Sequence, residues 1–148
     1  MPTIPPSILA APTLDDALSE TLRHFAADSG TVHLLEADGV LHLKAASAGI
    51  PEFVRETVRL VPVGKGMAGL AVQRVQPVTA CNIQTDASGD VRAGAKATGL
   101  EGAIVVPMLR DGSAAGALGI ANRAERTFSD DEQQLLLAIG AHLAAKHG

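Results

Sequence analysis

Few residues in this sequence have the side chains and the arrangement that catalysis or metal binding requires. His33 and His42 fall in two neighbouring alternating segments, where we expect them to share one face of a hairpin. Two histidines without a third ligand make a poor zinc site. His24 and His142 lie in stretches expected to be helical, and we expect surface or interface positions for them rather than haem ligation. We assign no metal ligand and no required cofactor. No Ser-His-Asp order or paired carboxylates stand out either.

Cys81 is the only cysteine, which excludes an intrachain disulfide and a cysteine-based metal cluster. A reducing compartment fits this composition, and we expect a cytoplasmic protein. A thiolate oxidised by its substrate needs a second thiol to resolve the sulfenate. We therefore expect Cys81 to be a small, semi-buried residue at the end of a strand, and we expect that the protein is not an enzyme.

Two basic residues are the best candidates for binding a charged ligand. Arg92 and Lys96 are one helical turn apart, so we expect them to share one helix face. That face is expected to point toward the loop that contains Asp86 and Asp90. If this helix face turns into a pocket, the ligand is anionic; the alternative is an ordinary solvated face. Gly64-Lys65-Gly66 lacks the spacing of a phosphate-binding loop and predicts only a bend.

Composition narrows the class of protein. The 148 residues are 47% hydrophobic and 19% charged, which is sufficient for one domain with a buried core. The net charge of −4 and the absence of Trp and Tyr exclude a basic or base-stacking nucleic-acid surface. The start of the chain lacks a basic segment typical of a signal peptide, and no apolar run is long enough to cross a bilayer. We expect no nucleic-acid or membrane partner.

The N-terminal region predicts an arm followed by a helix. Four prolines predict an extended arm over residues 1–12, with a single domain over 13–148. Thr13 can cap a helix over about 14–28, in which apolar residues recur at helical spacing.

A β-hairpin is expected next. Segments 31–36 and 40–46 alternate and flank Asp38-Gly39, a dipeptide suited to a tight turn. If the loop has two residues, the facing pairs are Val32 with Ala45 and Leu34 with Leu43.

The rest of the chain predicts an α+β fold with a mainly antiparallel sheet and helices on its faces. Segments 103–109 and 114–121 are almost uniformly apolar and flank a second Asp-Gly turn, so we expect central strands covered on both faces. Ser129 and Glu132 form a capping box before the last helix. The shorter elements expected between these are helices over 51–58, 67–74 and 91–98 and strands over 59–63 and 78–80.

Several stretches together resemble the GAF domain family, the small-molecule sensor module of signalling proteins. They are VPVGKGMAGLAVQRVQPV at 61–78, NIQTD at 82–86, TGLEGAIVVPML at 98–109, GALGIANR at 116–123 and TFSDDEQQLLLAIGAHLA at 127–144. The resemblance implies an antiparallel sheet of five or six strands with the N- and C-terminal helices on one face. Residues 64–74 and 81–98 would roof a ligand pocket on the other face. The ligand-binding residues implied in this way are Met67, Asp86, Arg92, Lys96, Val105, Pro107 and Gly119.

The resemblance implies a sensor that binds an unidentified small molecule without catalysis and shifts its terminal helices in response. Two alternatives stay open. One is a dimerisation or protein-interaction module with a collapsed pocket. The other is an enzyme like the free methionine sulfoxide reductases, disfavoured by the single cysteine and by Ala103 and Ala121 where such enzymes carry acids. The last helix is apolar over more than one stripe, so we expect a homodimer through the terminal helices.

Two further patterns known in GAF domains are only partly present in this sequence. Cysteine followed by asparagine, rather than histidine, does not match the bilin-binding members. The sequence also resembles the Asn-Lys, Phe, Asp-Glu pattern of the cyclic-nucleotide-binding members, but it has Arg in place of Lys and a spacing one residue shorter. We interpret it as structural, because its acids fall in the first turn of a helix. Its residues here are Asn122, Arg123, Phe128, Asp131 and Glu132.

Overall fold

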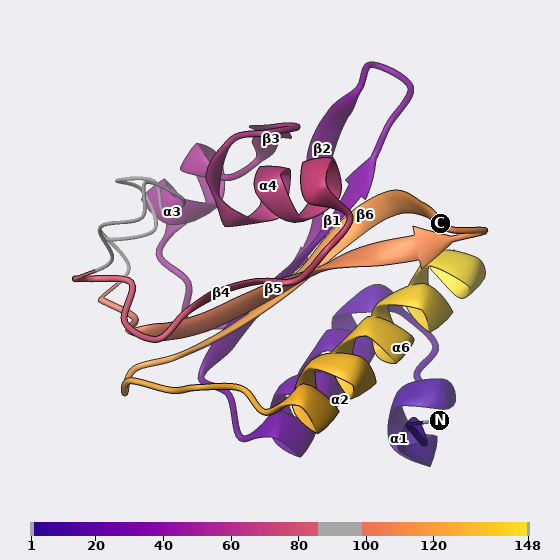
Figure 1. Ribbon diagram of the computed structural model, residues 1–148, viewed down its shortest axis with the longest axis horizontal. Helices are drawn as coiled ribbons and strands as arrows, with labels where there is room; N and C mark the ends of the chain where they lie inside the picture. Colours follow the sequence, from indigo (N-terminus) through magenta and orange to yellow (C-terminus); the bar gives the residue numbers. More distant parts are fainter. Residues whose placement is uncertain (1, 86–98, 148) are drawn as a thin grey trace.

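The computed structural model describes residues 2–85 and 99–147, which form three layers (Figure 1). Within these residues, six strands make one antiparallel sheet in the order β3-β2-β1-β6-β5-β4. Helices α1, α2 and α6 lie on one face, and α3 and α4 lie on the other. The predicted α+β fold is thereby confirmed. The helices are α1 (Pro6–Leu9), α2 (Leu14–Phe25), α3 (Glu52–Thr57), α4 (Gly66–Arg74) and α6 (Asp130–His147). The strands are β1 (Ser29–Leu35), β2 (Val40–Ala46), β3 (Leu60–Pro62), β4 (Val78–Ala80), β5 (Gly102–Arg110) and β6 (Ser113–Asn122).

Both long helices begin at the caps that the sequence predicts. The Thr13 Oγ1 accepts a hydrogen bond from the backbone N–H of Asp16 at 3.1 Å. The Glu132 N–H donates to the Ser129 hydroxyl at 3.1 Å, and the Ser129 N–H donates to the Glu132 carboxylate at 3.0 Å. These bonds satisfy helix N–H groups that have no partner inside the helix. No helix of the described ranges is long and apolar enough to span a membrane.

The N-terminal segment is not the extended arm expected from its prolines, because residues Pro6–Leu9 form α1. Proline is accommodated in the first helical turn, where its missing N–H would have no helical partner anyway. Ile8 is fully buried in the core beneath the terminal helices. The Lys146 ammonium of α6 donates to the carbonyls of Leu9 and Ala11 at 3.1 and 2.7 Å, which holds this segment against α6.

The β1–β2 hairpin departs from the predicted register. Val32 faces Ala45 as predicted, but the register shifts immediately afterwards, so the predicted pairing of Leu34 with Leu43 is wrong. Lys44 falls between the paired residues at the shift, and this extra residue makes a β-bulge in β2. The pairs beyond the bulge are His33 with Leu43, Leu34 with His42 and Leu35 with Leu41.

The bulge reverses the direction in which β2 residues face. Ala45 belongs to the core beneath the terminal helices, whereas Leu41 belongs to a cluster on the α4 side. His33 and His42 consequently lie on opposite faces, since neighbouring positions of a strand alternate. The prediction that they share a face is wrong. His42 reaches Asp38 at the surface, with 2.8 Å between Nε2 and Oδ2.

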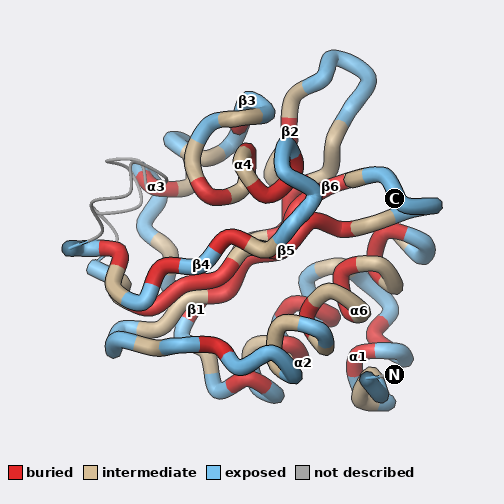
Figure 2. The backbone as a smooth tube through the Cα atoms, viewed as in Figure 1, coloured by how far each residue is buried: buried red, intermediate tan, exposed pale blue. Residues whose placement is uncertain are grey.

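The sheet separates a large core from two smaller clusters, and buried residues run through its middle strands (Figure 2). In β5, Ile104, Val106 and Met108 belong to the core beneath the terminal helices. The alternate residues Ala103 and Val105 belong to or pack against the clusters on the α4 side. Both faces of the central strands are therefore covered, as their uniformly apolar sequences predict. The helix predicted over 91–98 lies outside the described residues.

Candidate functional site

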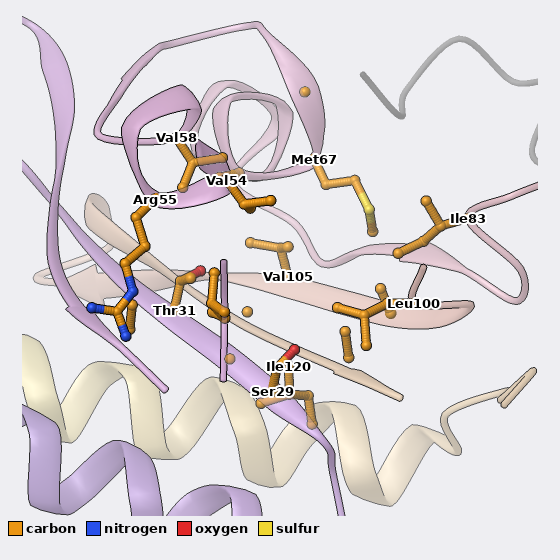
Figure 3. A pocket seen from close by; sticks show the side chains of 18 of the residues that line it. Ser29, Thr31, Val54, Arg55, Val58, Met67, Ile83, Leu100, Val105 and Ile120 are labelled. Atoms are coloured by element: carbon orange, nitrogen blue, oxygen red, sulfur yellow. The ribbon is translucent and has the colours of Figure 1, made fainter. Parts of the chain in front are cut away.

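A cavity of about 360 Å³ lies between the sheet and the layer of α3 and α4 (Figure 3). Strands β1, β5 and β6 form its floor, and the segment after β2, α3 and the start of α4 form its walls and roof. A volume of this size is sufficient for a small organic molecule. This position, on the side of the sheet away from α2 and α6, is the one implied by the resemblance.

Small residues on the sheet leave this space open. Ala103, Gly119 and Ala121 line the floor, where larger side chains would fill the volume. A Cβ on Gly119 would lie 3.1 Å from Val105 Cγ2, which is closer than ordinary contact. Gly69 positions the roof, because a Cβ there would lie 2.4 Å from the Pro62 carbonyl oxygen. Glycine at position 69 therefore lets α4 pack directly against the end of β3.

One end of the cavity is apolar. Met67 of α4, Ile83 and Leu100 stand together at this end in Figure 3, to one side of Val105 of the floor. Met67 and Ile83 are 8% and 3% exposed, so their side chains are fixed by packing rather than free in solvent. This end offers contact area to a hydrocarbon group.

The opposite end is polar and contains Arg55 of α3 (Figure 3). The Arg55 Nη2 donates to the Ser47 carbonyl at 3.3 Å, and the Ser47 hydroxyl accepts from the Gly30 N–H at 3.0 Å. The guanidinium is thereby anchored beside β1. Its Nε is buried and has no hydrogen-bond partner within residues 2–85 and 99–147. Thr31 of β1 also lines the cavity, and its hydroxyl oxygen lies 3.6 Å from the position of a Cβ on Gly119.

His33 is buried beside the cavity at 3% exposure. Its Nε2–H donates to the Val58 carbonyl at 2.8 Å, which ties the end of α3 to β1. Burial lowers the pKa of His33 more than the hydrogen bond to Val58 raises it. The imidazole is accordingly neutral at pH 7 and adds no charge to the cavity.

The charged side chains among the described lining residues are mostly cationic. Arg55, Lys65 and Arg123 carry positive charge, and Asp28 carries negative charge. The Asp28 carboxylate accepts a hydrogen bond from the backbone N–H of Arg123 at 2.7 Å. The balance of charge around the cavity therefore favours an anion over a cation.

The ligand-binding residues implied by the resemblance fall into three groups: some line the cavity, one lies elsewhere on the sheet, and the rest lie outside the described residues. Met67, Val105 and Gly119 line the cavity, and their role in binding stays a prediction. Pro107 is buried and pairs with Ala117 farther along β5, outside the lining residues of the described chain. Asp86, Arg92 and Lys96 lie outside the described residues.

Sequence reasoning missed the polar end of the cavity, because the resemblance placed the roof only at 64–74 and 81–98. A signal was present in the helix expected over 51–58. Val54 and Val58 are one turn apart and both line the cavity, and Arg55 follows the first of them. A basic residue beside an inward-facing apolar pair is a candidate for the same pocket.

The residues resembling the cyclic-nucleotide pattern join three elements on the helix side of the sheet. Asn122 donates to the Ala26 carbonyl at 2.9 Å and accepts from Arg126 at 2.9 Å. Arg126 also donates to Glu132 at 2.7 Å, and its guanidinium lies 4.6 Å from the centre of the Phe128 ring. These bonds tie the end of β6 to α2 and α6, in agreement with the structural interpretation.

Cys81 is exposed, so the prediction of a semi-buried cysteine is wrong. It directly follows β4, and its sulfur accepts a weak hydrogen bond from the Thr127 hydroxyl at 3.8 Å. It is not among the described residues that line the cavity. In the same ranges, no group of three His, Cys, Asp or Glu side chains could hold a metal ion.

The chain belongs to the GAF domain family, whose GAF_2 model matches residues 11–145. Similar solved structures include the GAF domain of a phosphoenolpyruvate-protein phosphotransferase from Coxiella burnetii, with 22% identity, a TM-score of 0.74, and coverage of 93% of this chain and 84% of that one. The free methionine-R-sulfoxide reductase of Neisseria meningitidis, solved with its substrate, has 18% identity, a TM-score of 0.73, and coverage of 90% and 74%. The type II enzyme of Thermoplasma acidophilum has 20% identity, a TM-score of 0.73, and coverage of 89% and 87%. A search of curated proteins found no match.

These structures correct the expectation that the protein is not an enzyme. Two of the three are free methionine-R-sulfoxide reductases, so catalysis is compatible with this fold. At these identities the likeness establishes the fold alone. GAF domains are ligand-binding or signalling-type domains, and the fold leaves the particular function open.

Proposed function

We propose that this GAF domain binds a small molecule in the cavity and acts as a sensor in signal transduction. The observation that carries the proposal is the 360 Å³ cavity itself, which joins an apolar end to a cationic end. A module working only through dimerisation or protein contact would need no such space. The cavity therefore favours the sensor over the collapsed-pocket alternative.

Strand β5 offers a route from the cavity to the terminal helices. Val105 lines the cavity, and its neighbours Ile104 and Val106 pack on the opposite side beneath α6. Gly140 of α6 approaches the same strand, since a Cβ on it would lie 3.3 Å from Met108 Cγ. A ligand that binds more tightly to one position of β5 than to another would shift α6 with it. The shift is expected to reach a second copy through paired terminal helices.

The homodimer is a separate part of the proposal. Leu135 and Leu137 of α6 are only partly buried against the core, which leaves apolar area for a partner helix. Light scattering during gel filtration measures the mass directly. A mass of twice 15.1 kDa supports the dimer, and 15.1 kDa at micromolar concentration contradicts it.

Filling the cavity tests the proposed ligand site. Thermal shift with cyclic nucleotides, amino acids and small carboxylates identifies a stabilising compound, and calorimetry then measures its affinity. Ala121→Leu adds volume to the cavity floor, whereas Ala37→Leu makes the same change at an exposed turn. The compound should bind the wild type and Ala37→Leu alike and bind Ala121→Leu at least about tenfold more weakly. Equal binding to all three proteins, or no binding compound, would contradict the proposal.

Because free methionine-R-sulfoxide reductases share this fold, an activity assay tests the enzymatic alternative. Turnover of free methionine sulfoxide is measured with an added thiol reductant, because the chain has a single cysteine. Turnover that disappears in Cys81→Ser would replace the sensor proposal with an enzymatic one. Absence of turnover in a protein that binds a ligand supports the sensor.

A further inference from the structure

We infer that the cavity selects a small organic anion with an apolar body, whose charged group lies against Arg55 and Thr31. This inference rests on the proposed function, because it names the class of ligand for the same site. The arrangement of the lining residues supports it.

The first step is the unused hydrogen-bonding capacity of Arg55. The guanidinium cannot lose its charge in a protein, and a buried N–H without a partner is costly. Only Nη2 has a protein acceptor within the described ranges, the Ser47 carbonyl, while Nε is buried and unpartnered there. Because Nε has almost no accessible surface, a ligand in the cavity reaches the terminal Nη groups instead. A carboxylate suits these groups best, because its two oxygens match the fork of a guanidinium.

The second step is the fixed position of that guanidinium. Ser47 accepts from Gly30 through its hydroxyl and donates to the Gly30 carbonyl through its backbone N–H, both at 3.0 Å. The acceptor of Arg55 is therefore part of the sheet edge next to Thr31. The charged group of Arg55 and the hydroxyl of Thr31 accordingly approach the cavity from the same end, as Figure 3 shows. A hydroxyl can donate a further hydrogen bond to a carboxylate.

The third step is the separation of the polar end from the apolar end. Met67, Ile83 and Leu100 stand at the far side of the cavity from Arg55 in Figure 3. A ligand that uses both ends has a hydrocarbon group a few bonds away from its charge. Simple inorganic anions would leave the apolar end unfilled, and long acyl chains would exceed a volume of 360 Å³.

The experiment compares 4-methylpentanoate with its neutral isostere 4-methylpentanamide by isothermal titration at pH 7.5. The variants are Arg55→Gln, which removes the charge, and Thr31→Val, which removes the hydroxyl with little change of shape. Arg59→Gln is the matched control, because Arg59 is 65% exposed, lies near Glu56 and is not among the described lining residues. Thermal unfolding of each variant shows that it is folded.

The wild type and Arg59→Gln should bind the carboxylate about 10- to 100-fold more tightly than the amide, the range expected for hydrogen bonds to a charged group. Arg55→Gln should bind both compounds with the affinity that the wild type shows for the amide. Thr31→Val should weaken carboxylate binding about three- to tenfold. Equal binding of the two compounds by the wild type, or a preference retained in Arg55→Gln, overturns the inference. In that case binding of the amide still upholds the proposed site. Failure of both compounds to bind the wild type overturns the inference alone, because the proposed site is tested separately by the compound screen and by Ala121→Leu.

Discussion

The two faces of the sheet are made from the same strands but are packed to different degrees. Beneath α2 and α6, large side chains such as Met108, Leu118, Leu136 and Ile139 are completely buried in one continuous core. On the α4 side, two smaller clusters flank a cavity floored by glycine and alanine. The face covered by α2 and α6, the helix face, therefore supplies most of the stability of the fold. The α4 face can therefore keep unfilled space for a ligand.

The largest expected effect comes from truncating one methionine on each face. Met108→Ala removes a fully buried side chain from the continuous core and should cost about 2–5 kcal/mol of the free energy of unfolding. Met67→Ala enlarges a space that is already present, and should cost less than about half as much. Urea denaturation measures both values. Equal costs would show that the two faces contribute alike to stability.

A second comparison adds one methyl group to a glycine on each face. Gly69→Ala places Cβ against the backbone oxygen of Pro62, which cannot move without shifting α4, and should cost about 1–3 kcal/mol. In Gly140→Ala the new Cβ lies 3.3 Å from the Met108 side chain, and the backbone atoms of Met108 and Pro107 are at the ordinary contact distances of 3.5 and 3.6 Å. Because alanine also favours a helix, the change should stay within about 1 kcal/mol. Urea denaturation again measures both. A reversed order would contradict the account of how α4 is positioned.

On the helix face, Glu132 makes a pH-dependent contribution to the stability of the fold. Hydrogen bonding to the Ser129 N–H, followed by bonding to Arg126, lowers the pKa of Glu132. A carboxylate of lowered pKa contributes stability above its unfolded pKa of about 4.3, and that contribution disappears as the pH falls through the folded pKa. Because Glu132 is partly exposed, Glu132→Gln should cost no more than about 1 kcal/mol at pH 7, and less below pH 4.

Asp131→Asn is the control, because Asp131 is an exposed acid in the same helical turn. It should lose less stability at pH 7 than Glu132→Gln. Chemical denaturation between pH 3 and pH 7 measures both variants. A loss in Glu132→Gln that does not change with pH would contradict the ionic part of its role.

The smallest expected effect is a change of stability with pH that comes from His33, on the α4 face. Burial lowers the pKa of His33, so the unfolded chain takes up a proton below about pH 6.5 while the folded protein does not. Stability should therefore fall as the pH drops from 6.5 toward 5.5. His33→Gln keeps a donor for the Val58 carbonyl and should reduce this slope, whereas His42→Gln at the surface should retain it. Unchanged slopes in both variants would contradict the role assigned to His33.

The regular elements could be predicted because their signals are local. Thr13, the Ser129–Glu132 capping box and the two Asp-Gly turns each act within a few residues. The bulge at Lys44 could not be predicted, because β2 contacts β1 on one side and β3 on the other, and their joint packing sets the register. The spacing of Val54, Arg55 and Val58 could indicate that Arg55 faces the cavity, but its contact with Ser47, just after β2, could not be predicted from a local pattern. Tertiary contacts, not residue types, place those groups.

The proposed ligand binds between the sheet and the layer of α3 and α4. Carbon-13 methyl spectra recorded during titration with 4-methylpentanoate test it directly. Resonances of Val54, Met67 and Val105, which line the cavity, should shift strongly. Direct shifts of that size are not expected at Leu136 and Ile139, beneath α6. Large shifts confined to the helix face, or none at saturating ligand, would contradict the account.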